Sequence, residues 1–208
     1  MEATFSQERA AAIMQVISER RSVRSFSDEV PARQALEQIL AAGLAAPYAA
    51  AMAPGAALDR RFFVLARGSK ALAAAAAAIQ AHATAALAAG TLPPPLRARL
   101  EPVAQGRILG VGTAPYYVVV AERGSMMPVQ QQSLAHALEN MWLMATALGL
   151  GMHLVSVTTT MADDPAFCRI LGLPVAEYVL NGCAIGVSAQ TPEARSLPDA
   201  AKATTWLA

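Results

Sequence analysis

The chain has 208 residues, of which 55% are apolar, and its formal net charge is +1. This size and composition indicate one globular domain, or one subunit of an oligomer that buries additional surface. A net charge so close to zero excludes a global field that would attract nucleic acid or an anionic membrane, so neither is expected as a partner.

Compartment and metal content follow from a few residue types. No basic segment followed by an apolar core stands at the N-terminus, so no signal peptide is expected. The longest apolar run, 141–155, is too short for a bilayer span, so no transmembrane segment is expected and a cytoplasmic location is predicted. Cys168 and Cys183 predict reduced, buried thiols. The three histidines lie far apart in the sequence, so no metal site is predicted.

The first part of the chain is expected to form two helices with a basic loop between them. Apolar residues at helical spacing predict a helix over 6–19, and a second helix is expected to begin at Pro31 and to end before Pro47. The segment 20–30 between them contains the sequence Arg-Arg-Ser-Val-Arg-Ser-Phe. Small and helix-breaking residues predict a loop over 48–59.

The middle of the chain is expected to contain two strands and two helices. A short strand is expected over 61–65, where apolar residues lie between charges. The alanine-rich run indicates a helix over about 69–88, because alanine is the best helix former. A further helix is expected over 95–109, after three prolines. The continuous apolar run 116–120 is typical of a strand that is buried on both faces.

The last third of the chain begins with its longest expected helix. This helix is predicted over 129–148, and two glycines end it before a strand over 153–157. A short helix is expected over 164–171, and a strand region over 178–187. The tail 190–208 has little periodicity and ends in apolar residues, which suggests that it docks on a partner subunit.

The basic loop is the most informative segment of the sequence. Arg20, Arg21 and Arg24 surround the hydroxyl of Ser22. Arginine offers a planar fork of donors that matches phosphate oxygens, so this density of donors favours a site for a dianionic phosphate. The alternative is a solvated basic turn that ends the first helix, where cations suit the negative end of the helix dipole. The local residues leave both interpretations open.

Two other signals are weaker. The sequence Gly149-Leu150-Gly151 lacks a third glycine and lies after a helix and before a strand, so a dinucleotide site of the Rossmann type is not expected. Glu139 in the longest helix could act as a general base, but a polar residue on the helix surface or at an interface is favoured.

The order of these segments resembles the FMN-dependent nitroreductase superfamily from about residue 11 to 198. The shared features are the basic loop, a helix ending in Ala-Pro, a Phe-rich strand, Ala-Pro before a valine strand, Ala-Leu-Glu-Asn-Met at 137–141, Gly-Leu-Gly before a strand, Leu-Gly-Leu-Pro at 171–174 and Ile-Gly at 185–186. The resemblance implies an α+β fold, in which helices flank a mostly antiparallel central sheet. It also implies one FMN-binding domain over 1–208 in an intertwined homodimer, with the tail 190–208 on the partner subunit.

The resemblance also implies which residues contact FMN. Arg195 matches a tail residue that approaches the phosphate bound by the basic loop, and the backbone of Val155 and Ser156 matches the segment near flavin N5. Arg107 either stabilises negative charge at the pyrimidine edge of reduced flavin or is an exposed helix charge. The full set of implied positions is Arg20, Arg21, Ser22, Arg24, Pro47, Tyr48, Ala49, Arg107, Val155, Ser156 and Arg195.

Two departures from the superfamily pattern affect this site. The loop 46–54 lacks the asparagine that many members carry, and Arg-Arg-Phe at 60–62 follows where those members have Gln-Pro-Trp. Tyr48 either covers the flavin or packs at the dimer interface. Glu193 stands where a second basic residue is often found, so phosphate affinity is expected to be lower.

The implied function is an FMN-dependent oxidoreductase. A reduced nicotinamide, NADH or NADPH, would pass hydride to flavin N5 and leave, and a small electron-poor acceptor such as a nitroaromatic or a quinone would replace it. No catalytic side chain is expected. The alternatives are a specialised enzyme of the same fold, namely an oxidase, dehydrogenase, dehalogenase or flavin-fragmenting enzyme, and a non-catalytic flavin-binding protein.

Overall fold

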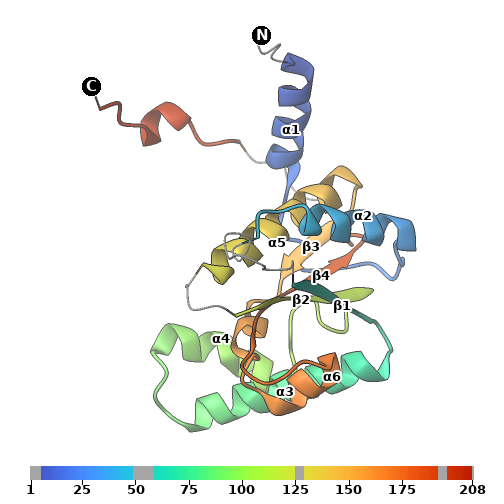
Figure 1. The fold of residues 1–208 in the computed structure, drawn as a ribbon, viewed down its shortest axis with the longest axis vertical. Helices are drawn as coiled ribbons and strands as arrows, with labels where there is room; N and C mark the ends of the chain where they lie inside the picture. Colours follow the sequence, from blue (N-terminus) through green and yellow to red (C-terminus); the bar gives the residue numbers. More distant parts are fainter. Residues whose placement is uncertain (1–5, 49–58, 125–128, 192–195, 208) are drawn as a thin grey trace.

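A four-stranded antiparallel sheet lies between two groups of helices (Figure 1). The computed structural model describes residues 6–48, 59–124, 129–191 and 196–207. Its strands, in the spatial order β1-β2-β4-β3, are β1 (Arg60–Ala66), β2 (Tyr116–Arg123), β4 (Tyr178–Gly186) and β3 (Gly151–Leu154). The predicted α+β class with an antiparallel sheet is therefore confirmed.

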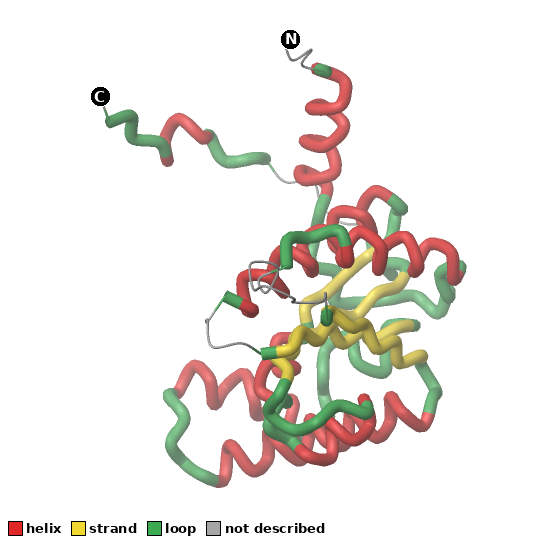
Figure 2. The backbone as a smooth tube through the Cα atoms, viewed as in Figure 1, coloured by secondary structure: helices red, strands yellow, loops and turns green. Residues whose placement is uncertain are grey.

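The helices cover both faces of the sheet (Figure 2). One core cluster joins the sheet to α2 and α5, and the other joins it to α3 and α6, while α4 packs on α3. The α-helices are α1 (Gln7–Glu19), α2 (Arg33–Leu44), α3 (Lys70–Ala88), α4 (Pro94–Ala104), α5 (Gln130–Ala147) and α6 (Pro165–Leu171). Two short 3₁₀ helices, η2 (Ser156–Thr160) and η3 (Ala200–Ala203), complete the described elements.

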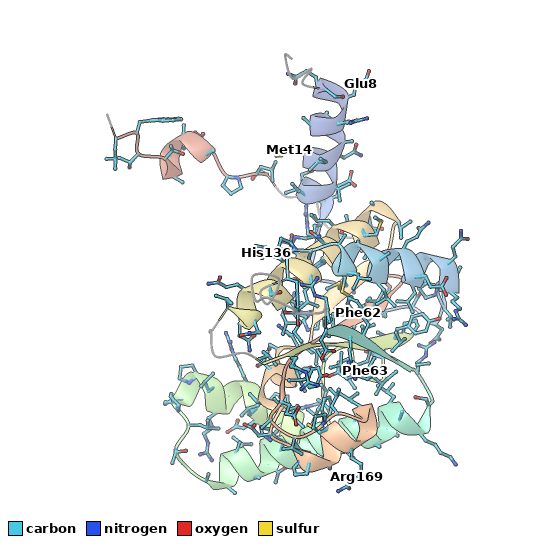
Figure 3. All side chains as sticks on the ribbon, in the orientation of Figure 1. Glu8, Met14, Phe62, Phe63, His136 and Arg169 are labelled. Atoms are coloured by element: carbon cyan, nitrogen blue, oxygen red, sulfur yellow. The ribbon has the colours of Figure 1, made fainter. Side chains whose placement is uncertain are left out.

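β2 is buried on both faces, as its continuous apolar run predicted. Tyr117 packs in the cluster with α3 and α6, whereas Val118 packs in the cluster with α2 and α5. Phe62 and Phe63 of the neighbouring strand β1 divide between the two faces in the same way (Figure 3). Successive side chains point to opposite faces of a strand, so helices on both faces require apolar residues at every position.

α3 is the alanine-rich helix, and Ser69 caps it by accepting a hydrogen bond from the N–H of Leu72. In the described part of the chain, this helix alone is long and apolar enough to cross a membrane by length and composition. Leu72, Ala75 and Ile79 belong to the core cluster beneath the sheet, and Ala83 is also buried. Across the apolar window of this helix, 28% of the residues are buried.

α4 is shorter than predicted, because it ends at Ala104 rather than at 109. Gly106 follows with a φ of 78°, which lies in the left-handed region where glycine avoids steric strain. The N–H of Arg107 then donates to the carbonyl of Pro102 and closes the turn. Arg107 therefore lies on an exposed turn after the helix and not within it.

The strand predicted over 153–157 was also misplaced, because β3 covers 151–154 and residues 156–160 form η2. The hydroxyls of Thr158, Thr159 and Thr160 each donate to the carbonyl three residues earlier. Threonine side chains that bond nearby carbonyls compete with a strand ladder. A run of three threonines thus favours the turn, although β-branched residues usually favour strands.

α1 and the tail extend away from the sheet and its helices (Figure 1). No residue of α1 is buried, and the side chains of Ile13 and Met14 are 59% and 49% exposed; Met14 is labelled in Figure 3. In the described tail segment 196–207, Trp206 is 90% exposed. The tail nevertheless contains η3, which its weak periodicity did not predict.

Both cysteines are free and buried, as predicted. Burial raises the pKa of the Cys183 thiol, and burial together with nearby Asp164 raises the pKa of the Cys168 thiol. The thiolate is the reactive form of cysteine, so both side chains are unreactive at neutral pH.

A polar cluster holds the ends of β1, β2 and β4 together. Asp59 accepts hydrogen bonds from Arg61, Arg123 and the hydroxyl of Tyr178, at 2.8 to 2.9 Å. Partial burial of Asp59 by itself raises its pKa, but these hydrogen bonds outweigh burial and lower the pKa to about 2.

Acid is therefore expected to weaken this cluster. The folded-state pKa of Asp59 lies below the ordinary 3.8, so its stabilising contribution is complete above pH 3.8 and disappears as pH falls towards 2. With screening by solvent, Asp59→Asn should cost about 1 kcal/mol of unfolding free energy at pH 7. Urea denaturation at pH 7 and pH 2.5 measures the difference, with Asp163→Asn as the control. An equal cost at both pH values would contradict the assignment.

Candidate functional site

The basic loop lies along the outer edge of β3. Ser22 and Met152 form a parallel bridge, and the N–H of Val23 donates to the carbonyl of Met152 at 3.0 Å. Gly151 permits this approach, because a Cβ there would lie 2.7 Å from the Cβ of Val23. The two segments run in the same direction there, and further along the loop Ser25 and Ser27 pair with the 187–189 segment after β4.

Arg20 is held by two side chains of α5. Its guanidinium lies over the ring of Trp142, with 4.4 Å between Cζ and the ring centroid. Its Nε lies 3.5 Å from Oε1 of Glu139. The Arg20 side chain is 20% exposed, whereas that of Glu139 is 52% exposed. The guanidinium is thus oriented by α5 and still reaches solvent.

Arg21 and Ser22 differ in what they present to solvent. The guanidinium of Arg21 turns back and donates to the carbonyls of Ser18 and Arg20, while Ser22 is exposed. A cation at these carbonyls suits the negative end of the α1 dipole. Arg21 therefore acts here as a cation at the end of α1, which was the alternative interpretation of the basic loop. Phosphate binding by Arg21 stays a prediction.

Arg24 is exposed and lies near His153 of β3. Partial burial, and then the positive charge of Arg24, lower the pKa of His153. Its Nδ1 is buried and has no hydrogen-bond partner among the described residues. At neutral pH the imidazole is therefore uncharged, and the arginines supply the positive charge at this edge of the sheet.

Val155 and Ser156 follow β3 directly. The N–H of Val155 donates to the carbonyl of Gly182 at 2.8 Å, which extends the contact with β4 by one residue. Val155 is buried, and Ser156 is exposed at the first position of η2. Residues 155–156 therefore directly follow the strand that the basic loop borders, and their position beside a flavin stays a prediction.

Pro47 and Tyr48 belong to a different group of contacts, which centres on a buried ion pair. Arg60 Nε donates to Glu122 Oε1 at 2.6 Å, and neither side chain is exposed to solvent. Arg60 also donates to the carbonyls of Gly43, Ala46 and Pro47, at 2.7 to 3.0 Å. One guanidinium thus joins the end of α2 and the following segment to the sheet.

Ser133 of α5 completes this buried group. Its hydroxyl accepts from Arg60 at 3.0 Å and lies 3.0 to 3.1 Å from Glu122 Oε1 and the carbonyl of Pro47. The Tyr48 ring centroid lies 5.8 Å from Cζ of Arg60. Reasoning from sequence missed Arg60 and Glu122, since each was only a charge at the end of an apolar run.

The described chain does not place all the predicted site residues together. Ser133 contacts Pro47, and Trp142 contacts Arg20. These two α5 residues are nine positions apart, so they lie on opposite sides of the helix. Arg107 lies on its exposed turn and donates to Gln105. Ala49 and Arg195 are outside the described residues. Of the others, Ser22 borders Met152 of β3, Arg24 lies near His153 of the same strand, and residues 155–156 follow that strand.

These groups suit a phosphate-bearing ligand better than a metal. Guanidinium and hydroxyl groups donate hydrogen bonds to phosphate oxygens, and a guanidinium has no lone pair to offer a cation. Within the described residues, no three side chains of His, Cys, Asp or Glu cluster as metal ligands.

Comparisons with known proteins identify the family and the fold. A model of the nitroreductase family matches residues 17–187. A nitroreductase with bound FMN from Bacteroides fragilis is 24% identical, with a TM-score of 0.73, over 94% of this chain and 98% of that one. A second FMN-bound nitroreductase, from Desulfitobacterium hafniense, is 22% identical, with a TM-score of 0.69, over 95% and 98%.

A BluB-like flavoprotein from Clostridium difficile shares the fold as closely. It is 19% identical, with a TM-score of 0.72, over 94% of this chain and 99% of that one. No curated protein matches the chain significantly. These structures share the fold, and the family match covers most of the chain, including the basic loop and β4. The chain therefore belongs to the nitroreductase family.

Proposed function

We propose that this protein is an FMN-dependent oxidoreductase that passes electrons from NADH or NADPH to a small electron-poor acceptor. The observation that carries the proposal is the basic loop laid along β3, where Ser22 bridges Met152 and Trp142 orients Arg20. Family membership and the FMN bound in two similar structures support it.

The residues present fit FMN. Arg20, Ser22 and Arg24 would bind its phosphate, with Arg195 from the tail as a further donor. Bound FMN supplies hydride and electron transfer, so no side chain need act as acid or base. The backbone of Val155 and Ser156 would border the ring system. Arg107 would stabilise negative charge at the pyrimidine edge.

The experiment that tests the proposal begins with purified full-length protein. A visible absorbance band of oxidised flavin is expected, either as purified or after adding FMN. Under anaerobic conditions NADH or NADPH should bleach that band, and a quinone or a nitroaromatic should restore it. Protein that binds no FMN would contradict the proposal. Bound FMN that neither nicotinamide reduces would direct attention to the specialised reactions.

A specialised reaction is the second candidate. The TM-scores to the BluB-like flavoprotein and to the nitroreductase differ by only 0.01, from 0.72 to 0.73, so the fold does not separate these functions. The altered loop 46–54 also departs from the pattern of many superfamily members. Flavin that nicotinamide reduces but no quinone or nitroaromatic reoxidises would favour this candidate.

A homodimer completes the proposed site and is expected in the cytoplasm. α1 has no buried residue, and Trp206 and Leu207 of the tail are 90% and 93% exposed. The partner subunit would bring Pro47, Tyr48 and Ala49 to a flavin held by this chain. Such exposed apolar surfaces are typical of subunit contacts.

Light scattering at micromolar concentration is therefore expected to report a dimer mass. Deletion of residues 190–208 should weaken both dimerisation and FMN binding, because the tail carries Arg195 and the terminal apolar residues. A monomer mass for the intact protein would contradict the dimer. Arg195→Ala in the intact chain serves as the control, since it should weaken FMN binding alone.

Tyr48→Ala is expected to change acceptor selection. A wall of small apolar side chains favours binding by shape with few orienting hydrogen bonds, so the ring should discriminate among flat acceptors. The Michaelis constants for quinones and nitroaromatics should change severalfold relative to each other, while reduction of bound flavin by nicotinamide should not. Tyr48→Phe, which keeps the ring, is the control. Equal constants in all three proteins would remove Tyr48 from the site.

A further inference from the structure

Two neighbouring residues of α5 make contacts with the basic loop that the proposed function does not use. Trp142 is nearly buried, and its Nε1 donates to the carbonyl of Arg21 at 3.0 Å while its ring supports Arg20. Glu139, three residues earlier on the same side of the helix, is the one carboxylate paired with Arg20 among the described residues.

We propose that Trp142 and Glu139 are positioning residues that set how strongly the protein distinguishes phosphorylated from unphosphorylated flavin. Trp142 holds the guanidinium of Arg20 in its binding position. Glu139 is an internal counter-charge that an incoming phosphate must displace from Arg20. The inference rests on the proposed function, because it assigns the basic loop to a flavin phosphate.

The contacts of Trp142 reach two consecutive residues of the loop. Its ring fixes the side chain of Arg20, and its N–H fixes the backbone at Arg21. Ordering a long side chain on binding costs conformational entropy, and a guanidinium already stacked on a ring has lost most of that freedom. Trp142 therefore pre-organises Arg20 before any ligand arrives.

Glu139 acts in the opposite direction. Its carboxylate lies 3.5 Å from Arg20 Nε and is half exposed, so it is weakly held and can turn to solvent. A phosphate on Arg20 carries a charge between −1 and −2 and would lie beside this carboxylate. Repulsion between the two anions opposes binding. Glutamine at position 139 would keep the length of the side chain and remove the repulsion.

The test compares two ligands that differ only in the phosphate. Full-length protein is titrated with FMN and with riboflavin, and each Kd is read from the quenching of flavin fluorescence. The variants are Glu139→Gln, Trp142→Phe and Trp142→Leu. Glu37→Gln is the matched control, because Glu37 is an exposed carboxylate whose ion pair is with Arg33 of its own helix, α2.

Glu139→Gln is expected to lower the FMN Kd about threefold to tenfold and to leave the riboflavin Kd unchanged. Rising salt should reduce this gain, because the Glu139 carboxylate is half exposed to solvent. Trp142→Leu should raise the FMN Kd about tenfold, with a smaller increase for Trp142→Phe, which keeps a ring but loses the N–H donor. A purely structural role would raise both Kd values together.

The outcomes separate this inference from the proposed function. An unchanged ratio of FMN to riboflavin Kd in Glu139→Gln and Trp142→Phe would overturn the inference and leave FMN binding intact. Wild-type protein that binds neither ligand would overturn both. If Trp142→Leu fails to fold, Glu139→Gln and Trp142→Phe still test the inference. Glu139→Gln alters an exposed side chain, and Trp142→Phe keeps an aromatic ring, so both are expected to fold.

Discussion

Glu122→Leu is expected to destabilise the protein by about 3–5 kcal/mol, the largest effect of any single change considered. The substitution leaves the guanidinium of Arg60 buried with only neutral hydrogen-bond partners, namely four backbone carbonyls and the Ser133 hydroxyl. A buried charge without its counter-ion loses its hydration and gains little in return. Urea denaturation followed by circular dichroism measures the loss.

Two further variants test that explanation. The double variant Arg60→Met with Glu122→Leu should regain most of the lost stability, because apolar residues of similar volume often replace a buried ion pair at little cost. Arg33→Ala at the exposed pair with Glu37 should cost no more than about 0.5 kcal/mol. A double variant as unstable as the single one would show that charge burial is not the cause.

The same pair should also affect the proposed site. Arg60 binds the carbonyls of Ala46 and Pro47, so it holds the segment that leads into Tyr48. The double variant should therefore fold well and yet place this segment less firmly. Crystallographic displacement parameters or proteolysis at the loop would report that difference.

Arg20→Ala is expected to weaken FMN binding on the order of tenfold to a hundredfold. The basis is the loss of charge-assisted hydrogen bonds worth roughly 1.5–3 kcal/mol. Arg24→Ala should act in the same direction, and riboflavin binding should change little in either variant. Equilibrium titration of full-length protein measures each Kd.

Arg9→Ala is the matched control, because Arg9 is an exposed arginine on α1, outside the basic loop. It should bind FMN as the wild type does. Arg20→Lys separates charge from geometry, since lysine keeps the charge and loses the planar fork of donors. FMN retention that is unchanged in both Arg20→Ala and Arg24→Ala would remove the basic loop from the phosphate site.

Most of the fold could be predicted from local pattern. The run 116–120 predicted a strand buried on both faces, and the apolar spacing over 129–148 predicted α5 to within a residue or so at each end. These predictions succeed because periodicity and continuous apolar runs reflect which faces of an element meet the core. The order of such segments was enough to identify the family and to select the basic loop.

Local pattern failed where a few hydrogen bonds decided the backbone. Three threonine hydroxyls made 156–160 a 3₁₀ helix, and a glycine with positive φ ended α4 before Arg107. Such contacts involve only neighbouring residues, but the same residues are compatible with several backbone conformations. Their outcome depends on the packing around them.

The sequence by itself determined the family fold and the presence of a donor-rich loop, because both are recognised from residues that are close along the chain. Only the tertiary structure decided how those donors are used. It turned Arg21 onto α1, stacked Arg20 on Trp142 and paired it with Glu139. It also buried Arg60 against Glu122, 62 residues away. The contacts of Arg20 depend on which face of α5 meets the loop, and the Arg60–Glu122 pair depends on the register of β1 against β2. A one-dimensional pattern does not contain that information.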